Sequence, residues 1–167
     1  MALILSGDTG VPASGMPTGS VIQTVSTTKT DSFSTNSTSF TDVTGLYVTI
    51  TPSSATSKIL ITASVSYSSN PDDVLIRLVR DSTAIAVGTS GASYNGLNQI
   101  NGNAPNRYGM NTGSTCYLDS PATASAITYK IQMMSVNGGA AYGYVNRRGE
   151  STNYGGTSTI TVMEIKV

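Results

Sequence analysis

The feature that most constrains the fold of this chain is a two-residue alternation of apolar and polar side chains, clearest at residues 59–67. Every second residue of this stretch can face a core: Ile59, Ile61, Ala63, Val65 and Tyr67. Successive side chains of a β-strand point to opposite faces of the sheet, so the pattern predicts a strand with one buried face. No stretch shows the spacing of three and four residues that marks an amphipathic helix. The sequence therefore predicts an all-β body.

Short runs of the same kind recur at residues 21–25, 32–35, 46–51, 74–86, 116–118, 126–134, 140–146 and 157–167. The run at 74–86 is interrupted by Asp81, Ser82 and Thr83, residue types that favour tight turns, and it predicts a β-hairpin. About eight to ten short strands at this spacing are typical of an antiparallel sandwich or jelly roll. We predict a jelly-roll domain at residues 20–167 and an extended N-terminal arm at residues 1–19, where Gly, Pro and Ser are frequent.

Charge and histidine content narrow the range of functions. Nine Lys and Arg balance nine Asp and Glu, so the chain has no basic field to attract nucleic acid or an anionic membrane. Histidine, the commonest general base and metal ligand, is absent. No secretory signal is recognised at the N-terminus, and no apolar run is long enough to span a membrane. We expect no nucleic-acid partner, no membrane insertion, no cofactor and no metal.

Catalytic activity is not expected either. Cys116 is the single cysteine and has no histidine to act as its base, so we interpret it as a small core residue. Glycoside hydrolysis normally requires two carboxyl groups about 5 to 10 Å apart. The only glutamates are Glu150, in a predicted loop, and Glu164, in the last predicted strand, and no motif supports a catalytic role for either.

Five blocks of sequence follow the predicted strands and turns: MPTGSVIQ at 16–23, TSFTDVTGL at 38–46, ITPSSATSKILI at 50–61, LDSPAT at 118–123 and STITVMEI at 158–165. The last four resemble the repeated signature of a phage virion domain that is common in the tail fibres of cyanophages and other aquatic phages, and the block at 16–23 is similar to the lead-in that such fibre heads carry. The resemblance covers residues 17–167 and implies a trimeric jelly roll similar to the heads of tumour necrosis factor and complement C1q. Its motifs mark strands and turns, and they specify neither a receptor nor a reaction.

The resemblance implies a structural protein of the virion, assembled in the host cytoplasm. Two roles stay open, namely a tail-fibre head that binds the host receptor and a capsid decoration protein that stabilises the phage head. In both roles we expect the N-terminal arm, through Leu3, Ile4 and Leu5, to dock on another virion protein of the baseplate, tail or capsid. A third hypothesis is a free secreted lectin, which the lack of a recognised secretory signal disfavours.

Apolar residues on both faces of some strands are consistent with the homotrimer that the resemblance implies. Leu75 and Val79 lie opposite Val74, Ile76 and Leu78 in the same run, so one face can fill the sandwich while the other meets a neighbouring copy. The balanced charge leaves little electrostatic repulsion between copies.

Two stretches, 88–113 and 137–156, are longer than a connection requires and are rich in Tyr, Asn and Gly. Tyrosine supplies rigid contact area and asparagine supplies adaptable hydrogen bonds, a composition typical of binding loops. We predict that these loops contact a host-surface glycan. The candidate residues are Tyr94, Asn106, Arg107, Tyr108, Arg147, Arg148 and Tyr154.

Alternative interpretations stay open for several of these side chains. Tyr142 and Tyr144 alternate with small residues and can pack inside the sandwich or between subunits instead of binding a ligand. Arginines 107, 147 and 148 can bind an acidic sugar or a phosphate, because a guanidinium group matches the geometry of an anion. They can equally be solvated charges or intersubunit partners of the acidic residues Asp72, Asp73 and Glu150.

Overall fold

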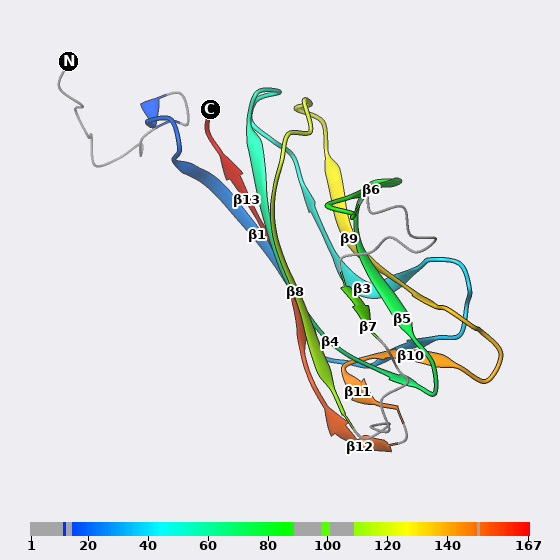
Figure 1. Ribbon diagram of the computed structural model, residues 1–167. Coiled ribbons are helices and arrows are strands. Elements are labelled where there is room, and N and C mark those ends of the chain that lie inside the picture. Colours follow the sequence, from blue (N-terminus) through cyan, green and yellow to red (C-terminus); the bar gives the residue numbers. More distant parts are fainter. Residues whose placement is uncertain (1–11, 13–14, 89–97, 101–108, 150) are drawn as a thin grey trace.

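The computed structural model describes residue 12 and residues 15–88, 98–100, 109–149 and 151–167. In this part of the chain thirteen β-strands form two antiparallel sheets that stack as a sandwich, together with a small separate hairpin (Figure 1). The predicted all-β fold is therefore confirmed. Among the described residues no helix is long and apolar enough to cross a membrane.

Sheet A is formed by β1 (Val21–Lys29), β2 (Phe33–Thr35), β4 (Lys58–Asn70), β8 (Asn111–Asp119), β10 (Tyr142–Val145) and β13 (Ser158–Ile165). Its central strand β4 pairs with β8 on one side and with β13 on the other. Strand β1 lies outside β13, while β10 and β2 extend the sheet past the point where the pairing of β13 ends. The order across the main part of sheet A is β8, β4, β13 and β1.

Sheet B is formed by β3 (Thr41–Ile50), β5 (Val74–Arg80), β6 (Thr83–Ile85), β7 (Asn98–Ile100) and β9 (Ile127–Ser135). Its order is β3, β9 and β5, and both β6 and β7 pair with β5. The predicted hairpin at 74–86 is confirmed as β5 and β6, which are joined at Asp81 and Ser82. Strand β3 contains an irregularity at which Gly45 adopts a φ of 80°, a conformation that other residues rarely take.

The chain passes repeatedly from one sheet to the other. Strand β3 of sheet B is followed by β4 of sheet A and then by β5 of sheet B, and β8 of sheet A is followed by β9 of sheet B. This alternation wraps the chain around the sandwich, as in a jelly roll. The predicted jelly-roll architecture is confirmed.

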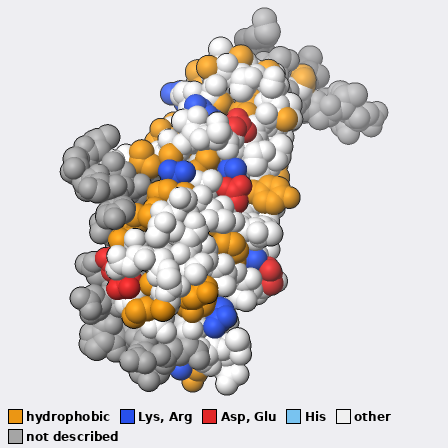
Figure 2. Space-filling view, turned by 90° about the vertical axis from the view of Figure 1, so that its right-hand side faces the viewer, with side chains coloured by type: hydrophobic (Ala, Val, Ile, Leu, Met, Phe, Trp, Pro, Cys, Tyr) orange, Lys and Arg blue, Asp and Glu red, His pale blue; other side chains and the backbone are white. Residues whose placement is uncertain are grey.

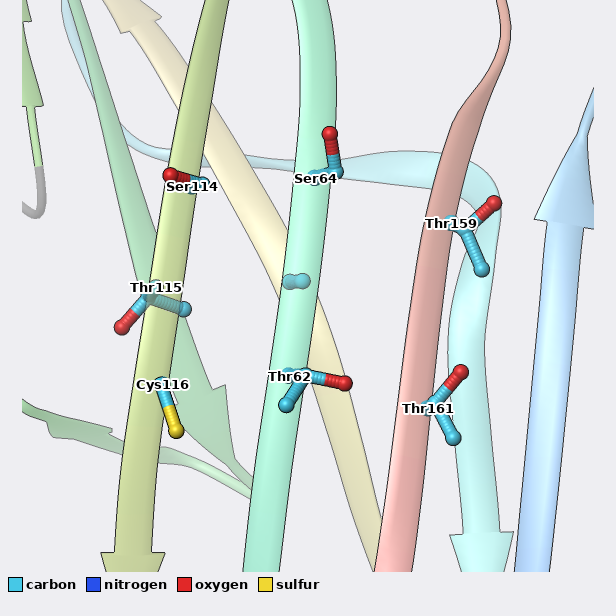
Figure 3. A pocket seen from close by; sticks show the side chains of 8 residues that line it. Thr62, Ser64, Ser114, Thr115, Cys116, Thr159 and Thr161 are labelled. Carbon is cyan, nitrogen blue, oxygen red and sulfur yellow. The ribbon is translucent and has the colours of Figure 1, made fainter.

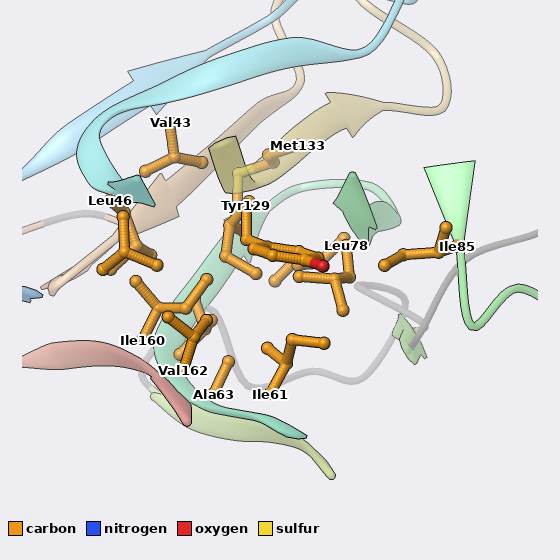
Figure 4. Close-up of a cluster of buried hydrophobic side chains, with 14 of the residues drawn as sticks. Val43, Leu46, Ile61, Ala63, Leu78, Ile85, Tyr129, Met133, Ile160 and Val162 are labelled. Carbon is orange, nitrogen blue, oxygen red and sulfur yellow. The ribbon is translucent and has the colours of Figure 1, made fainter. Parts of the chain in front are cut away.

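The hydrophobic core fills the space between the sheets (Figure 4). The inward face predicted for β4 is confirmed, because all five of its residues are buried: Ile59, Ile61, Ala63, Val65 and Tyr67. Leu46 of β3, Tyr129 of β9 and Val162 of β13 are fully buried in the same cluster. Burying a large apolar side chain contributes roughly 1.5–3 kcal/mol, so this cluster is the main source of stability.

Glu164 of β13 fixes the connection between β3 and β4. Its Oε1 accepts hydrogen bonds from the backbone N–H of Ser53 at 2.8 Å, from the Ser53 hydroxyl at 2.5 Å and from the Ser57 hydroxyl at 2.7 Å. Its Oε2 accepts one from the side-chain amide of Gln23 at 2.6 Å. Burial raises the pKa of Glu164, but these hydrogen bonds outweigh burial and hold it below its ordinary value. Three of the five sequence blocks, 16–23, 50–61 and 158–165, thus meet at one carboxylate.

Asp119 of β8 joins the two sheets. One guanidinium nitrogen of Arg80, in β5, lies 2.9 Å from both carboxylate oxygens, and the hydroxyl of Tyr129, in β9, donates to Oδ2 at 2.8 Å. Burial and then the hydrogen bond to Asp119 raise the pKa of Tyr129. The block at 118–123 therefore ties an edge strand of sheet A to two strands of sheet B.

Three expectations are wrong. Cys116 is exposed rather than buried, because Thr115 and Tyr117 take the inward positions of β8. Leu75 and Val79 are 0% and 1% exposed within the single chain, so these two side chains are already buried without a neighbouring copy. Residues 137–156 are not one long loop: β10 confirms the run predicted at 140–146, but the residues after it form the unpredicted hairpin of β11 (Arg147–Arg148) and β12 (Ser151–Gly155).

Candidate functional site

Three of the predicted binding residues come together in the β11–β12 hairpin: Arg147, Arg148 and Tyr154. They lie beside Tyr142 and Tyr144 of β10, and we call these five residues the Arg–Tyr cluster. The remaining candidates lie outside the described residues; they are Tyr94, Asn106, Arg107 and Tyr108 of the first stretch and Leu3, Ile4 and Leu5 of the arm.

Asn146 anchors the hairpin where it leaves the sandwich. This buried residue adopts a φ of 58°, and its amide nitrogen donates to the carbonyl oxygens of Lys29 at 2.8 Å and Asp31 at 3.1 Å. Its amide oxygen accepts the Ser158 hydroxyl at 2.6 Å. The backbone N–H of Gly156 donates to the Asn146 carbonyl at 3.1 Å, so this hydrogen bond joins the two ends of the hairpin segment. A single buried amide therefore holds both ends of the hairpin.

The hairpin packs closely against the body. The Ser68 hydroxyl of β4 donates to the carbonyl of Arg147 at 2.8 Å. A Cβ atom on Gly156 would lie 2.4 Å from the Ser66 hydroxyl oxygen, and one on Gly149 would lie 3.0 Å from the Cβ of Asn70. A side chain at position 156 would therefore force Ser66 to move, whereas one at position 149 would make a tight contact with Asn70. The guanidinium groups that the hairpin carries are held on a fixed support.

Each arginine of the cluster lies over an aromatic ring. The guanidinium carbon of Arg147 is 4.5 Å from the ring centroid of Tyr144, and that of Arg148 is 4.2 Å from the centroid of Tyr154. Both distances are within the range of cation–π attraction. Two N–H groups of Arg147 also donate to the carbonyls of Arg148 and Gly149, each at 3.4 Å. These contacts restrict the rotamers of both arginines before any ligand arrives.

The tyrosines of β10 lie on the outer face of sheet A, so the interpretation that they pack inside the sandwich is wrong. Gly143 and Val145 take the inward positions, and a Cβ atom on Gly143 would collide with Met133 and Val74. The rings of Tyr142 and Tyr144 stack with their centroids 6.0 Å apart and an interplanar angle of 20°. Tyr142 is 37% exposed and Tyr154 is 54% exposed, so the cluster offers aromatic surface to a partner.

The cluster lies at one end of the sandwich. In Figure 1 the hairpin β11–β12 is at the bottom, whereas the C-terminus and the beginning of β1 are at the top. The strands of sheet A run between these two ends. An attachment near the beginning of β1 therefore leaves the Arg–Tyr cluster facing away from the point of attachment.

A second candidate surface is the outer face of sheet A between its two ends. Across β8, β4 and β13 the side chains of Ser114, Cys116, Thr62, Ser64, Thr159 and Thr161 line a shallow hollow of about 400 Å³ (Figure 3). Towards the C-terminal end the same face continues as Leu60, Met163 and Leu118, of which Leu118 is 47% exposed. Hydroxyls on the face pair with each other, as Ser26 and Thr161 do at 2.7 Å. Among the outward-facing residues of the paired segments of these strands and β1, the charged one is Lys58, at the beginning of β4.

The outer face of sheet B differs in charge. Asp42 accepts the Lys130 ammonium at 2.8 Å and the Gln132 amide at 2.6 Å, and Gln132 accepts Nε of Arg77 at 2.8 Å. The Arg77 guanidinium lies 3.8 Å from the centroid of Phe40. Figure 2 looks onto this side and shows acidic and basic side chains next to each other. The hydrogen bond from Lys130 lowers the pKa of Asp42. Sheet B thus presents a charged outer surface, whereas the outer face of β8, β4, β13 and β1 carries mainly hydroxyl and apolar side chains, with Lys58 at the beginning of β4.

Comparisons with known proteins leave the family open. No family model matches the chain, and no curated protein matches it. One matching solved structure is described as "Structure of infectious bursal disease virus Gx strain"; it is 14% identical, with a TM-score of 0.41, and the match covers 99% of this chain and 46% of that chain. At this level the likeness extends to neither family nor activity, so the resemblance to phage tail-fibre heads stays a prediction.

Sequence reasoning missed the neutral face of sheet A. The hydroxyl residues that form it come from β8, β4 and β13, which are far apart in sequence, and only the strand order places them side by side. The available signal was the polar set of the alternating run at 59–67, where Thr62 and Ser64 occupy positions that charged residues often take on exposed strands.

Proposed function

We propose that this chain is a structural protein of a phage virion, a trimeric head that is attached near its N-terminus and meets the host surface with its opposite end. The role is one of assembly and binding, without catalysis. The observation that carries the proposal is the outer face of β8, β4, β13 and β1, where hydroxyl and apolar side chains predominate and Lys58 is the charged residue of the paired segments. A face of this kind fits contact between identical copies better than contact with water.

The composition of the face favours a copy of the same chain as its partner. Nine basic and nine acidic residues leave the chain with no net charge, so copies do not repel each other. The apolar end of the face includes Leu118 and Val21, each 47% exposed, beside the partly buried Met163. Three copies that place these faces around a closed axis would bury them without leaving an open surface for further association.

The sequence blocks behind the phage resemblance have a structural explanation that agrees with a shared head domain. The block 50–61 provides the serines that bind Glu164, and the block 118–123 provides Asp119, which binds Arg80 and Tyr129. These interactions hold loops and sheets in place and leave the exposed surfaces free to vary. They support a common scaffold and say nothing about the receptor.

The oligomeric part of the proposal is tested with the thiol of Cys116, which lies on the neutral face and is the only cysteine in the chain. In a trimer closed through sheet A, we expect a maleimide to react with Cys116 much more slowly than with a cysteine introduced as Thr49→Cys on the outer face of sheet B. Equal reaction rates at the two positions would show that the face of sheet A is open to solvent.

The virion part of the proposal is tested by counting copies per particle. Purified phage that encodes this chain is digested and quantified by mass spectrometry against an isotope-labelled standard. Copies in the tens per particle, released together with tail fibres, are the result we expect. Hundreds of copies released together with the capsid lattice would favour the alternative of a capsid decoration protein. Absence from the particle would contradict both.

A further inference from the structure

The Arg–Tyr cluster has the chemistry of a site for one class of ligand. It combines exposed aromatic faces at Tyr142 and Tyr154 with two guanidinium groups that are stacked on rings. Aromatic faces pack against the C–H groups of sugar rings, and guanidinium groups form paired hydrogen bonds to carboxylate or sulfate. We propose that the cluster is a subsite for an acidic sugar residue of a polysaccharide, an inference that rests on the proposed contact with the host surface.

Charge supports an anionic ligand over a neutral one. The chain as a whole is neutral, yet the segment 142–156 contains two arginines and one glutamate. A neutral sugar requires only amides and hydroxyls next to the rings, and the chain has many of both. The half-buried Arg147 and Arg148 are adjacent in the hairpin, and their positive charge favours an acidic ligand over a neutral one.

The cluster is also preorganised. The hairpin is closed by Asn146 and held to β4 by Ser68, and its arginines are restrained by ring contacts and by carbonyl acceptors. A ligand therefore loses less free energy to the ordering of side chains than it would on flexible surface arginines. The five N–H donors of Arg147 exceed the two backbone bonds that it makes, which leaves donors for an anion.

Binding of defined polysaccharides to the full chain tests the inference. Titration calorimetry compares oligogalacturonate, which carries carboxylates, with dextran sulfate, which carries sulfates, and with neutral dextran. We expect the protein to bind an acidic polymer more tightly than dextran, and to lose affinity when the salt concentration rises from about 50 to about 300 mM. The carboxylate and sulfate arms identify which acidic group is preferred, and a preference for either over dextran supports the inference.

Two matched variants locate the binding. The double variant Arg147→Gln/Arg148→Gln removes both charges of the cluster, whereas Arg77→Gln removes an arginine that is also stacked on a ring but lies on sheet B. We expect the double variant to weaken binding of the acidic polymer at least about tenfold, as expected for losing charge-assisted hydrogen bonds. Arg77→Gln should stay within about twofold of the unmodified chain. Circular dichroism and thermal melting confirm that both variants are folded.

Tyr154→Ala and Tyr154→Phe separate stacking from charge. Loss of binding in the alanine variant, with binding retained in the phenylalanine variant, is expected if the ring faces the sugar. Equal affinity of the double arginine variant and Arg77→Gln, or equal affinity of the unmodified chain for acidic polymers and dextran, would overturn the inference. Such a result leaves the trimer and its place in the virion standing, because those are measured by thiol protection and copy number. Conversely, the chain could prove monomeric and absent from virions and still bind oligogalacturonate. That outcome would support the subsite and contradict the proposed function.

Discussion

At the scale of single residues, the ionised carboxylate of Glu164 is expected to carry a measurable share of the stability. In Glu164→Gln one carboxylate oxygen becomes an amide donor that faces either the amide of Gln23 or the hydroxyls of Ser53 and Ser57. We expect the free energy of unfolding at pH 7 to fall by about 1–3 kcal/mol, measured by urea denaturation. The control Asp42→Asn, on the exposed face of sheet B, should cost no more than about 1 kcal/mol.

The comparison between the unmodified chain and Glu164→Gln also gives a prediction about how stability depends on pH. Because the pKa of Glu164 in the folded chain lies below its ordinary value of 4.5, the ionised form stabilises the fold fully above that value. This contribution is lost as the pH falls through the folded-state pKa. The stability difference between the unmodified chain and Glu164→Gln should therefore shrink as the pH is lowered from about 5 to about 3. A difference that stays constant over this interval would show that Glu164 is not the group that titrates.

Ala122 is a position at which a substitution by glycine should increase the stability of the fold. It is exposed and adopts a φ of 55°, a conformation that costs a residue with a Cβ atom about 1–2 kcal/mol. Glycine also makes the unfolded chain more flexible, which lowers stability by about 0.5–1 kcal/mol and offsets part of this gain. We expect Ala122→Gly to raise the free energy of unfolding by up to about 1 kcal/mol. Ala124→Gly, at an exposed neighbour outside the left-handed region, should lower it, and the same sign for both variants would contradict the explanation.

The sequence predicted the burial of residues well where alternation is regular and poorly where it is not. The inward set of β4 is apolar at every second position, and all five of its residues are buried as predicted. In β8 the inward positions hold Thr115 and Asp119, whereas Cys116 was predicted to be a core residue because free cysteine is usually buried. Hydrogen bonding decides the matter, since Asp119 is buried through its bonds to Arg80 and Tyr129.

At the scale of elements, the hairpin β11–β12 depends on Asn146. Asn146→Ala removes three side-chain hydrogen bonds and places an alanine at a φ of 58°. We expect a loss of about 2–4 kcal/mol in the free energy of unfolding, with faster hydrogen exchange of the Gly156 amide than in the unmodified chain. Asn153→Ala, at an exposed position of β12, should change stability by no more than about 0.5 kcal/mol. Unchanged exchange at Gly156 in Asn146→Ala would show that the hairpin is held by other contacts.

Most strands could be predicted from the sequence, but their ends and the shortest pairs could not. Strand β3 begins at Thr41, five residues before the predicted run, because the irregularity around Gly45 breaks the two-residue period. Strands β11 and β12 have no apolar alternation, since they rest on the outer face of β4 and bury no core side chain. Their pairing depends on the closure at Asn146 and Gly156, which alternation does not reveal.

At the scale of the whole molecule, a charge on the neutral face should separate the copies without unfolding them. Thr161→Lys places an ammonium group on the outer face of β13 and removes one hydroxyl pair, with Ser26. Thr49→Lys is the matched control on sheet B, where it also removes one hydroxyl pair, with Thr128. We expect Thr161→Lys to raise the dissociation constant of the trimer at least about tenfold and Thr49→Lys to leave it within about twofold. Equal effects would place the contact between copies elsewhere.

The alternation of apolar and polar residues does not predict the order of the strands, and the composition of the two outer faces depends on that order. The period of two states which residues share a face of one strand, but it does not state which strands are neighbours. The neutral surface appears only when β8, β4, β13 and β1 are placed side by side. The Arg–Tyr cluster likewise requires β10 to lie next to the hairpin that follows it.

Sedimentation equilibrium of the unmodified chain at micromolar concentration tests the central claim most directly. A jelly roll that closes its neutral sheet face against two further copies predicts three times the chain mass of 17.2 kDa, which is about 52 kDa. A single species of 17.2 kDa across the whole concentration range, with Cys116 as reactive as a free thiol, would contradict it.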